Sequence, residues 1–192
     1  MPRPKRVSDA EVLDAAVAVL AERGIGAFTL SEIAAKVGLA RATLIQRFGD
    51  RDAILRLMAE HEVEATRAYL DGLPVETGPR GLWAFIEEIV GSMGPGDGFA
   101  VRVAIAAMEA RDPDLRRLAG RRYALVQDAM ATRIPDHPDR QEIARTLHAV
   151  IAGATMQWVV SDHPDLAADV LDQVGRAIRR LFPELDPASS ES

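Results

Sequence analysis

Apolar residues recur at helical spacing along nearly the whole chain, and this periodicity limits the fold more than any other feature. In the first segment Val12, Leu13, Ala16, Val19 and Leu20 fall on one face of a helix. No convincing run of residues alternates between apolar and polar, as a half-buried strand would. The pattern predicts an all-α chain of about nine helices over its 192 residues.

Glycine, and proline with flanking aspartate, end these helical segments. Gly24 and Gly26 end the first one, and Gly38 ends a short second helix that starts at Thr29. Glu32, three residues after Thr29, has the spacing of a capping box. The remaining helices are expected over 42–48, 51–70, 79–93, 97–111, 114–133, 139–161 and 164–182.

Charge is distributed unevenly along the chain. With 23 basic and 29 acidic residues the net charge is −6, which taken whole argues against a nucleic-acid partner. Residues 1–56, however, hold nine basic and seven acidic residues, a net of +2, so the remainder carries −8. This asymmetry predicts a basic binding head on an acidic body.

Two further features concern the compartment. The chain has no cysteine, which excludes a disulfide scaffold and a thiolate metal site and favours the reducing cytoplasm. The longest uncharged, mostly apolar run, 149–161, is shorter than the ~20 residues that span a bilayer. Asp9, Glu11 and Asp14 interrupt the first apolar stretch, so we expect neither a signal peptide nor a membrane partner.

Residues 29–48 have the composition of a helix-turn-helix. Ala34 is the small residue where the two helices touch, Gly38 makes the tight turn, and Leu44 anchors the second helix. Other helical hairpins also use glycine and alanine in this way. The polarity of the second helix favours DNA binding, because two buried positions are surrounded by side chains suited to bases or phosphates: Arg41, Thr43, Gln46 and Arg47.

The second helix also carries a recognisable motif. The sequence Thr43-Leu-Ile-Gln-Arg-Phe48, followed by Arg51, resembles a recognition-helix pattern Thr-Leu-Tyr-x-His-Phe with a lysine three residues later. That pattern belongs to TetR-type transcriptional regulators. Residues 8–56 of this chain resemble the DNA-binding domain of those regulators. The resemblance implies a three-helix DNA-binding domain over 1–50 and a helical effector-binding and dimerisation domain over 51–192.

The resemblance also implies roles for single residues. Phosphate contacts would come from Thr29, Thr43, Arg47 and Arg51. Base contacts would come from Ser31, Arg41, Ala42 and Ile45. Gln46 joins the DNA-binding set on its polarity.

Three positions depart from the family pattern. Ile45 stands where tyrosine is usual, which loses a hydroxyl and offers an apolar contact to a thymine methyl. Arg47 replaces histidine and stays charged at every pH. Ala40 stands where serine or threonine caps the helix, at a cost of ~1 kcal/mol. The basic arm before the first helix, Arg3-Pro-Lys5-Arg6, fits either the minor groove or a solubilising terminus.

The last two helices carry apolar residues on more than one face, which suggests a subunit interface beside the core. The resemblance implies that they pair with their symmetry mates as a four-helix bundle. The predicted interface residues are Leu147, Ile151, Ala154, Trp158, Val170, Val174 and Ile178. A second set, Ala149, Ala152, Met156 and Val159, covers much of the other side of the first of these helices. A purely intramolecular core is the alternative.

The middle helices are where the family binds its effectors. Candidate ligand-binding residues are Trp83, Phe85, Phe99, Met108, Tyr123 and Met130. Trp83 and Phe85 are two residues apart on one helix and therefore point to different sides. Aromatic and methionine side chains on helices are more often ordinary core, which is the competing interpretation.

An enzyme was tested as a rival class. His61-Glu-Val-Glu-Ala65 lacks the second histidine of a zinc-protease helix, and Gly94-Pro-Gly-Asp-Gly98 has no preceding strand to make a phosphate loop. The Asp-His-Pro-Asp segments at 136–139 and 162–165 are typical helix starts. We therefore expect no enzyme, metal or cofactor.

The sequence predicts a cytoplasmic, homodimeric transcriptional regulator, most simply a repressor. Its partners would be a palindromic double-stranded DNA operator and a small-molecule effector that releases it. A DNA-binding regulator without an effector is one alternative. A helical binding module or enzyme that carries this head is another.

Overall fold

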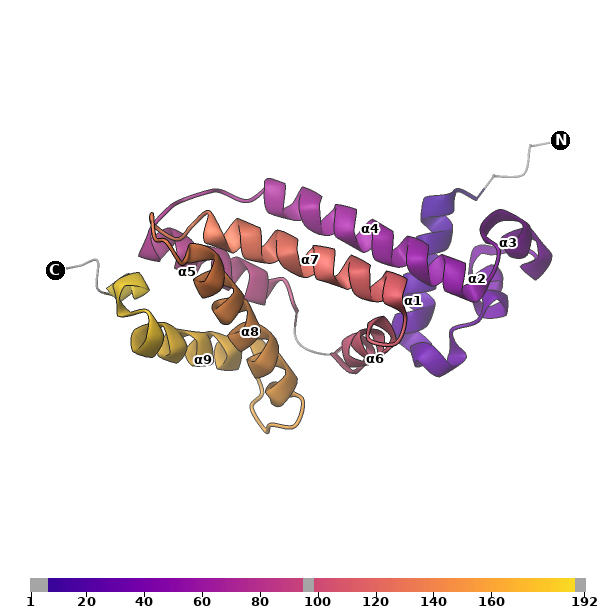
Figure 1. Cartoon of the computed structure of the whole chain (residues 1–192). Coiled ribbons are helices and arrows are strands. Elements are labelled where there is room, and N and C mark those ends of the chain that lie inside the picture. Colours follow the sequence, from indigo (N-terminus) through magenta and orange to yellow (C-terminus); the bar gives the residue numbers. More distant parts are fainter. Residues whose placement is uncertain (1–6, 95–98, 189–192) are drawn as a thin grey trace. The chain divides into compact units, whose positions relative to one another are not determined.

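The computed structural model describes residues 7–94 and 99–188, leaving out the side chains of Ala27 and of 99–101. Within those ranges every regular element is helical, in agreement with the all-α prediction (Figure 1). The helices are α1 (Asp9–Ala27), α2 (Leu30–Val37), α3 (Arg41–Phe48), α4 (Arg51–Asp71), α5 (Pro79–Gly91), α6 (Phe99–Glu109), α7 (Pro113–Ala131), α8 (Arg140–Trp158) and α9 (Leu166–Leu181). A short 3-10 turn, Pro183–Leu185, follows α9. None of the described helices combines the length and apolar character needed to cross a bilayer.

The chain divides into two compact units. We call the unit formed by residues 1–65 and 100–120 the head, and the unit formed by 66–99 and 121–192 the body. The boundaries fall inside α4 and α7 and next to the start of α6. A compact unit is defined by packing and a functional domain by role, so the functional division after residue 50 stays a prediction.

The head is built around its own apolar cluster, drawn from α1 to α4. Val12, Ile33, Leu44 and Ile54 are all fully buried there. Ile105 and Met108 of α6 pack against the same cluster. A helix that follows α4 by a long stretch of sequence therefore contributes to the core under the helix-turn-helix.

Two glycines set the path of the chain through the head. Gly24 has φ 70° and ψ 176°, which interrupts α1 where the sequence predicts its end. Gly38 has φ 68° and ψ 30°, the left-handed conformation in which a side chain is disfavoured. The following amide, of Leu39, donates to the carbonyl of Ala34 at 2.9 Å and closes the turn between α2 and α3.

The capping box predicted at Thr29 and Glu32 forms only in part. The Thr29 hydroxyl accepts from the amide of Glu32 at 3.3 Å, but the Glu32 carboxylate pairs with Arg23 of α1 at 2.6 Å. The ion pair draws the carboxylate away from the cap. A complete capping box lies instead at the start of α1, between Ser8 and Glu11.

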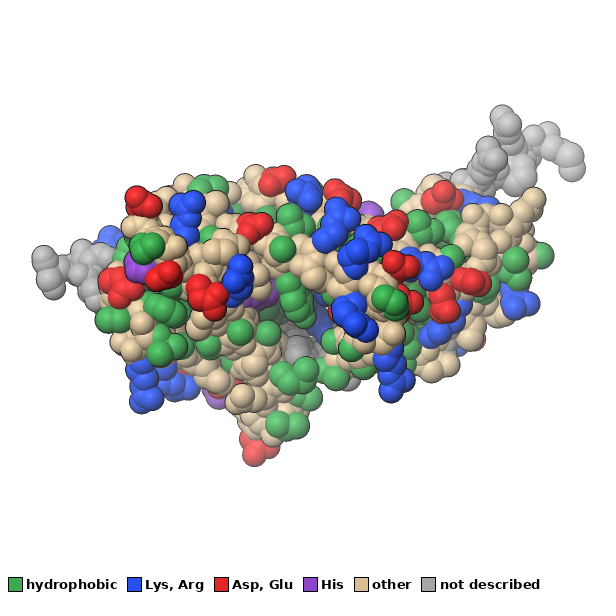
Figure 2. Space-filling view, in the orientation of Figure 1, with side chains coloured by type: hydrophobic (Ala, Val, Ile, Leu, Met, Phe, Trp, Pro, Cys, Tyr) green, Lys and Arg blue, Asp and Glu red, His purple; other side chains and the backbone are tan. Residues whose placement is uncertain are grey.

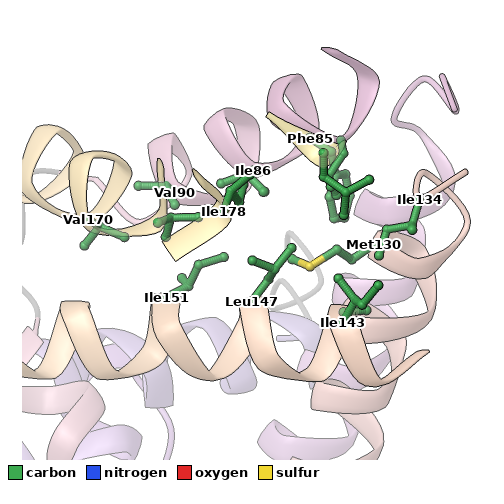
Figure 3. Packing of buried hydrophobic residues seen from close by; sticks show 14 of the residues in the cluster. Phe85, Ile86, Val90, Met130, Ile134, Ile143, Leu147, Ile151, Val170 and Ile178 are labelled. Atoms are coloured by element: carbon green, nitrogen blue, oxygen red, sulfur yellow. The ribbon is translucent and has the colours of Figure 1, made fainter. Parts of the chain in front are cut away.

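The body has a second apolar cluster, to which α5, α7, α8 and α9 all contribute. Figure 3 shows Leu147 and Ile151 of α8 directed toward Ile86 of α5 and Ile178 of α9. All four are at most 1% exposed. This core fixes the relative position of the body helices.

The stripe predicted as a subunit interface lies in this core, which corrects the assignment of those residues. Leu147, Ile151, Ala154, Val170, Val174 and Ile178 are each at most 2% exposed within a single chain. Trp158 packs at the edge of the same cluster. Side chains this buried cannot form a surface for a partner, because their apolar area is already used inside the chain.

Apolar side chains on the other side of α8 remain exposed. Met156 and Val159 are 49% and 44% exposed, and Ala149 and Ala152 are exposed beside them along the helix. The sequence pattern predicts apolar side chains on two faces of α8; the face with Leu147 is buried within the chain and the face with Met156 is exposed.

Candidate nucleic-acid interface

α3 is held to the head by one buried side chain and leaves most of its surface in solvent. Leu44 is fully buried, whereas Arg41, Ala42, Ile45 and Gln46 are exposed. Thr43 is half-buried. The helix therefore presents two small or apolar side chains between two polar ones on its exposed face.

The start of α3 lacks a side-chain cap, as the sequence predicts. Ala40 makes no capping hydrogen bond. The first turn of α3 also has no acidic residue, whereas the first turn of α1 has Asp9 and Glu11. The first amides of α3 are thus left without an acidic neighbour in their own turn. Such amides attract anions, because the helix dipole adds to their partial positive charge.

Arg41 is the cation of the helix-turn-helix that is not engaged by another described residue. Lys36 pairs with Glu22 at 2.7 Å and Arg47 pairs with Asp9, whereas within the described ranges no hydrogen bond or ion pair joins Arg41 to another side chain. Hydrogen bonding and charge from Lys36 hold the pKa of Glu22 below its usual range. Basic and acidic side chains are interspersed over the visible face of the chain (Figure 2).

Arg47, at the last turn of α3, contacts the start of α1. Its Nη1 donates to the carbonyl of Val7 at 3.0 Å, and its Nη2 pairs with the carboxylate of Asp9. The guanidinium carbon also lies 5.2 Å from the centre of the Phe48 ring. The side chain is 28% exposed, so part of its surface still faces solvent.

Arg51, at the start of α4, contacts the other end of α1. Its Nε donates to the carbonyl of Phe28 at 2.9 Å, and its Nη2 donates to the carbonyl of Ile25 at 3.4 Å. The guanidinium lies 5.6 Å from the centre of the Phe28 ring. Arg51 thus caps the carbonyl end of α1, where a cation is favoured. The sequence motif gave no sign of this internal contact.

Thr29 and Ser31 lie exposed at the start of α2. The Thr29 hydroxyl accepts from the Glu32 amide, which leaves its own hydrogen free to donate. Thr43 carries a further hydroxyl on α3. The predicted DNA-binding residues thus lie on the helix-turn-helix and, for Arg51, at the start of α4, and Arg47 and Arg51 also make internal contacts.

The candidate effector residues do not form one group. Phe85 and Met130 are buried in the body core, and Trp83 packs against it while its indole N–H donates to Glu87 at 2.9 Å. Met108 packs in the head. Tyr123, 46% exposed, meets the ring of His148 edge-on at 5.2 Å. The Phe99 side chain and the basic arm before residue 7 lie outside the described residues.

A buried arginine in the body escaped the sequence reasoning. Arg133 is 2% exposed, and its guanidinium lies 4.0 Å from the centre of the Phe85 ring. It donates to the carbonyl of Ala129 at 2.6 Å and to that of Pro74. Burial lowers the pKa of Arg133. Nothing in the sequence marks this arginine, because one arginine at a helix end is ordinarily exposed. Among the described residues no group of three acidic or histidine side chains has the arrangement of a metal site.

The helix-turn-helix is similar in sequence to known proteins. Residues 12–66 match the sequence profile of "Bacterial regulatory proteins, tetR family". This part of the chain, from α1 into α4, is similar to the TetR family. The chain is 25% identical over 179 residues to the HTH-type transcriptional repressor Rv1474c of Mycobacterium tuberculosis, covering 88% of this chain and 92% of that one.

Solved structures share the fold of the chain. A TetR transcription regulator from Haloarcula marismortui superposes with a TM-score of 0.73 at 17% identity, over 87% of this chain and 94% of that one. The multidrug binding protein EbrR, complexed with imidazole, superposes with a TM-score of 0.67 at 20% identity, over 92% and 96%. The chain thus shares its fold with both proteins.

Proposed function

We propose that this protein is a TetR-type transcriptional regulator, a homodimeric repressor that binds a palindromic operator and is released by a small-molecule effector. The observation that carries the DNA-binding part is the exposed face of α3, with Leu44 alone buried beneath it. Since its target is chromosomal DNA, we expect the protein in the cytoplasm.

The exposed face of α3 suits a major groove. Arg41 is suited to the acceptor edge of a guanine and Gln46 to an adenine. Ala42 and Ile45 offer methyl groups to thymine, and the exposed hydroxyl of Ser31 on α2 is proposed as a further base contact. Phosphate contacts are proposed for Thr29, Thr43, Arg47 and Arg51, because hydroxyls and guanidinium groups beside a recognition helix fix its register on the duplex.

The exposed apolar face of α8 supports a dimer. A two-fold axis through Met156 and Val159 would bury side chains that a single chain leaves 49% and 44% exposed. Two heads would then occupy successive major grooves about 34 Å apart. We accordingly propose this face, in place of the buried stripe, as the interface.

Release by an effector is supported by analogy. EbrR, of the same fold, has been solved with imidazole and with proflavin. An effector acts by binding the two states of a repressor with unequal affinity, typically by about 1–3 kcal/mol. The burial of Phe85 and Met130 favours a different candidate, a regulator without an effector. A compound that raises the melting temperature of the protein and also releases it from DNA would show that the regulator has an effector.

A footprint on the DNA flanking the gene tests the proposal. We expect two protected half-sites related by a two-fold axis. Arg41→Ala should relax the base preference at one position and cost about 1–3 kcal/mol of discrimination. Arg47→Ala should weaken binding to all sequences and lower its salt dependence. Protection of no fragment at moderate salt would refute the DNA-binding proposal, and equal effects of both variants would refute the division of roles.

A further inference from the structure

We propose that Asp9, on α1, is a positioning residue for DNA binding: it holds the guanidinium of Arg47 in the orientation in which its remaining edge faces a phosphate. This inference rests on the proposed function. It concerns a residue of the first helix, outside the helix-turn-helix motif itself.

The geometry fixes Arg47 at three points. The Val7 carbonyl accepts from Nη1 at 3.0 Å, the Asp9 carboxylate pairs with Nη2, and the Phe48 ring lies 5.2 Å from the guanidinium carbon. Of the two hydrogen-bond acceptors, the Val7 carbonyl is neutral and the Asp9 carboxylate is charged. An arginine has more N–H donors than these contacts use. With 28% of the side chain exposed, part of Arg47 remains open to solvent.

The partners of Arg47 are themselves held in place. Val7 packs against the apolar cluster of the head. Ser8, between Val7 and Asp9, is fixed by the capping box, in which its amide donates to the Glu11 carboxylate at 2.8 Å and its hydroxyl accepts from the Glu11 amide at 3.2 Å. The clamp on Arg47 is therefore attached to the start of α1, which the capping box and the packing of Val7 hold in place.

Holding an arginine in place before DNA arrives has a defined consequence. A free arginine loses rotamer freedom when it binds a phosphate, and a side chain already fixed in the free protein avoids most of that loss. Asp9 also places a negative charge near the duplex, which opposes binding. Positioning of Arg47 strengthens DNA binding and the charge of Asp9 weakens it. Whether affinity falls or rises when Asp9 is removed therefore shows which effect is larger.

Two substitutions at position 9 separate acceptor from charge. Asp9→Ala and Asp9→Asn both remove the charge and both remove the acid from the first turn of α1, but asparagine keeps an oxygen that accepts from Arg47. We expect Asp9→Ala to weaken operator binding about fivefold, within the range for ordering one long side chain. Asp9→Asn should bind within about twofold of the unsubstituted protein. Asp14→Ala, which removes another exposed acid of α1, serves as the control and should not weaken binding.

The measurement is equilibrium binding to the footprinted operator fragment at several salt concentrations, below the melting temperature of every variant. Arg47→Met should lower the slope of log K against log salt by about 0.9, whereas Asp9→Ala should leave it unchanged because Arg47 still reaches its phosphate. In the Arg47→Met background, Asp9→Ala should have no further effect.

Three results would overturn the proposal. Binding by Asp9→Ala that is equal to or tighter than that of the unsubstituted protein would show that Asp9 only repels DNA. Equal losses for Asp9→Ala and Asp9→Asn would show that the hydrogen bond is not what matters. An undiminished effect of Asp9→Ala in the Arg47→Met background would show that Asp9 does not act through Arg47. If the unsubstituted protein itself protects no DNA, the proposed function fails first and this inference fails with it.

Discussion

α3 in the head and α9 in the body are held in place by different means. α3 buries one of its eight residues, Leu44, and Arg47 and Arg51 on either side of the following turn hold the two ends of α1. α9 buries five of its sixteen residues in the body core. A helix that must show its surface to DNA has few side chains left for packing, and polar contacts to a neighbour compensate for them.

The two units also differ in net charge. The head has 13 basic and 13 acidic residues, and the body has 10 and 16. The net of +2 found for residues 1–56 therefore disappears once residues 57–65 and 100–120 are counted with the head. For the proposed function, attraction to DNA would have to come from the placement of a few cations, above all Arg41, because the net charge of the head is zero.

The largest expected effects come from the two cores. Leu44→Ala in the head and Leu147→Ala in the body each remove a fully buried side chain, and each should lower the free energy of unfolding by about 2–5 kcal/mol. Urea denaturation measures the loss. Because the clusters are separate, amide exchange should quicken mainly in the head for Leu44→Ala and mainly in the body for Leu147→Ala. Equal quickening throughout for both variants would contradict the comparison.

The next largest effect concerns the exposed face of α8. Met156→Arg places like charges close together across the proposed two-fold axis, so it should raise the dimer dissociation constant by at least about tenfold. Light scattering over a dilution series measures the mass. Met156→Leu keeps an apolar side chain of similar size and serves as the control. A dimer that survives Met156→Arg unchanged would move the interface elsewhere.

A smaller effect is expected at Ile45, which is 42% exposed on α3. Replacing thymine by uracil in the operator removes only the methyl group that an apolar side chain would touch. At the relevant position this should weaken binding by roughly 1 kcal/mol, near the value of one buried methylene. Ile45→Ala should be less sensitive to the same replacement. If every thymine can be replaced without loss, Ile45 does not read a methyl group.

The sequence predicted most of the fold because helical spacing and breaks are local properties. Gly24 and Gly38 stand where the structure has the interruption of α1 and the left-handed end of α2. The exposed face of α3 was also readable, since the motif leaves Leu44 as the anchor. Local patterns thus identify elements and their polar faces.

Contacts between distant segments were not predictable in the same way. An amphipathic pattern shows that α8 has two apolar faces, but only packing shows that the Leu147 face is the buried one. Arg47 and Asp9 are 38 residues apart, and Arg133 and Pro74 are 59 apart, so no local spacing signals either contact. Met108 likewise joins the head core from α6, across a long stretch of sequence.

The smallest expected effect is a dependence of body stability on pH through His148 of α8. Burial lowers the pKa of His148 below its ordinary 6.5, and Gln127 lies 3.3 Å from its Nδ1. The unfolded chain then takes up a proton more readily than the folded one. The free energy of unfolding should therefore fall as the pH drops below about 6.5, by at most ~1.4 kcal/mol per pH unit. His148→Gln cannot titrate, so urea midpoints of this variant should vary less between pH 7 and about pH 5. Glu22 does not confuse the result, because a carboxyl with a pKa below 4.5 affects stability only in more acidic solution. An equal slope in both proteins would assign the pH dependence to other groups.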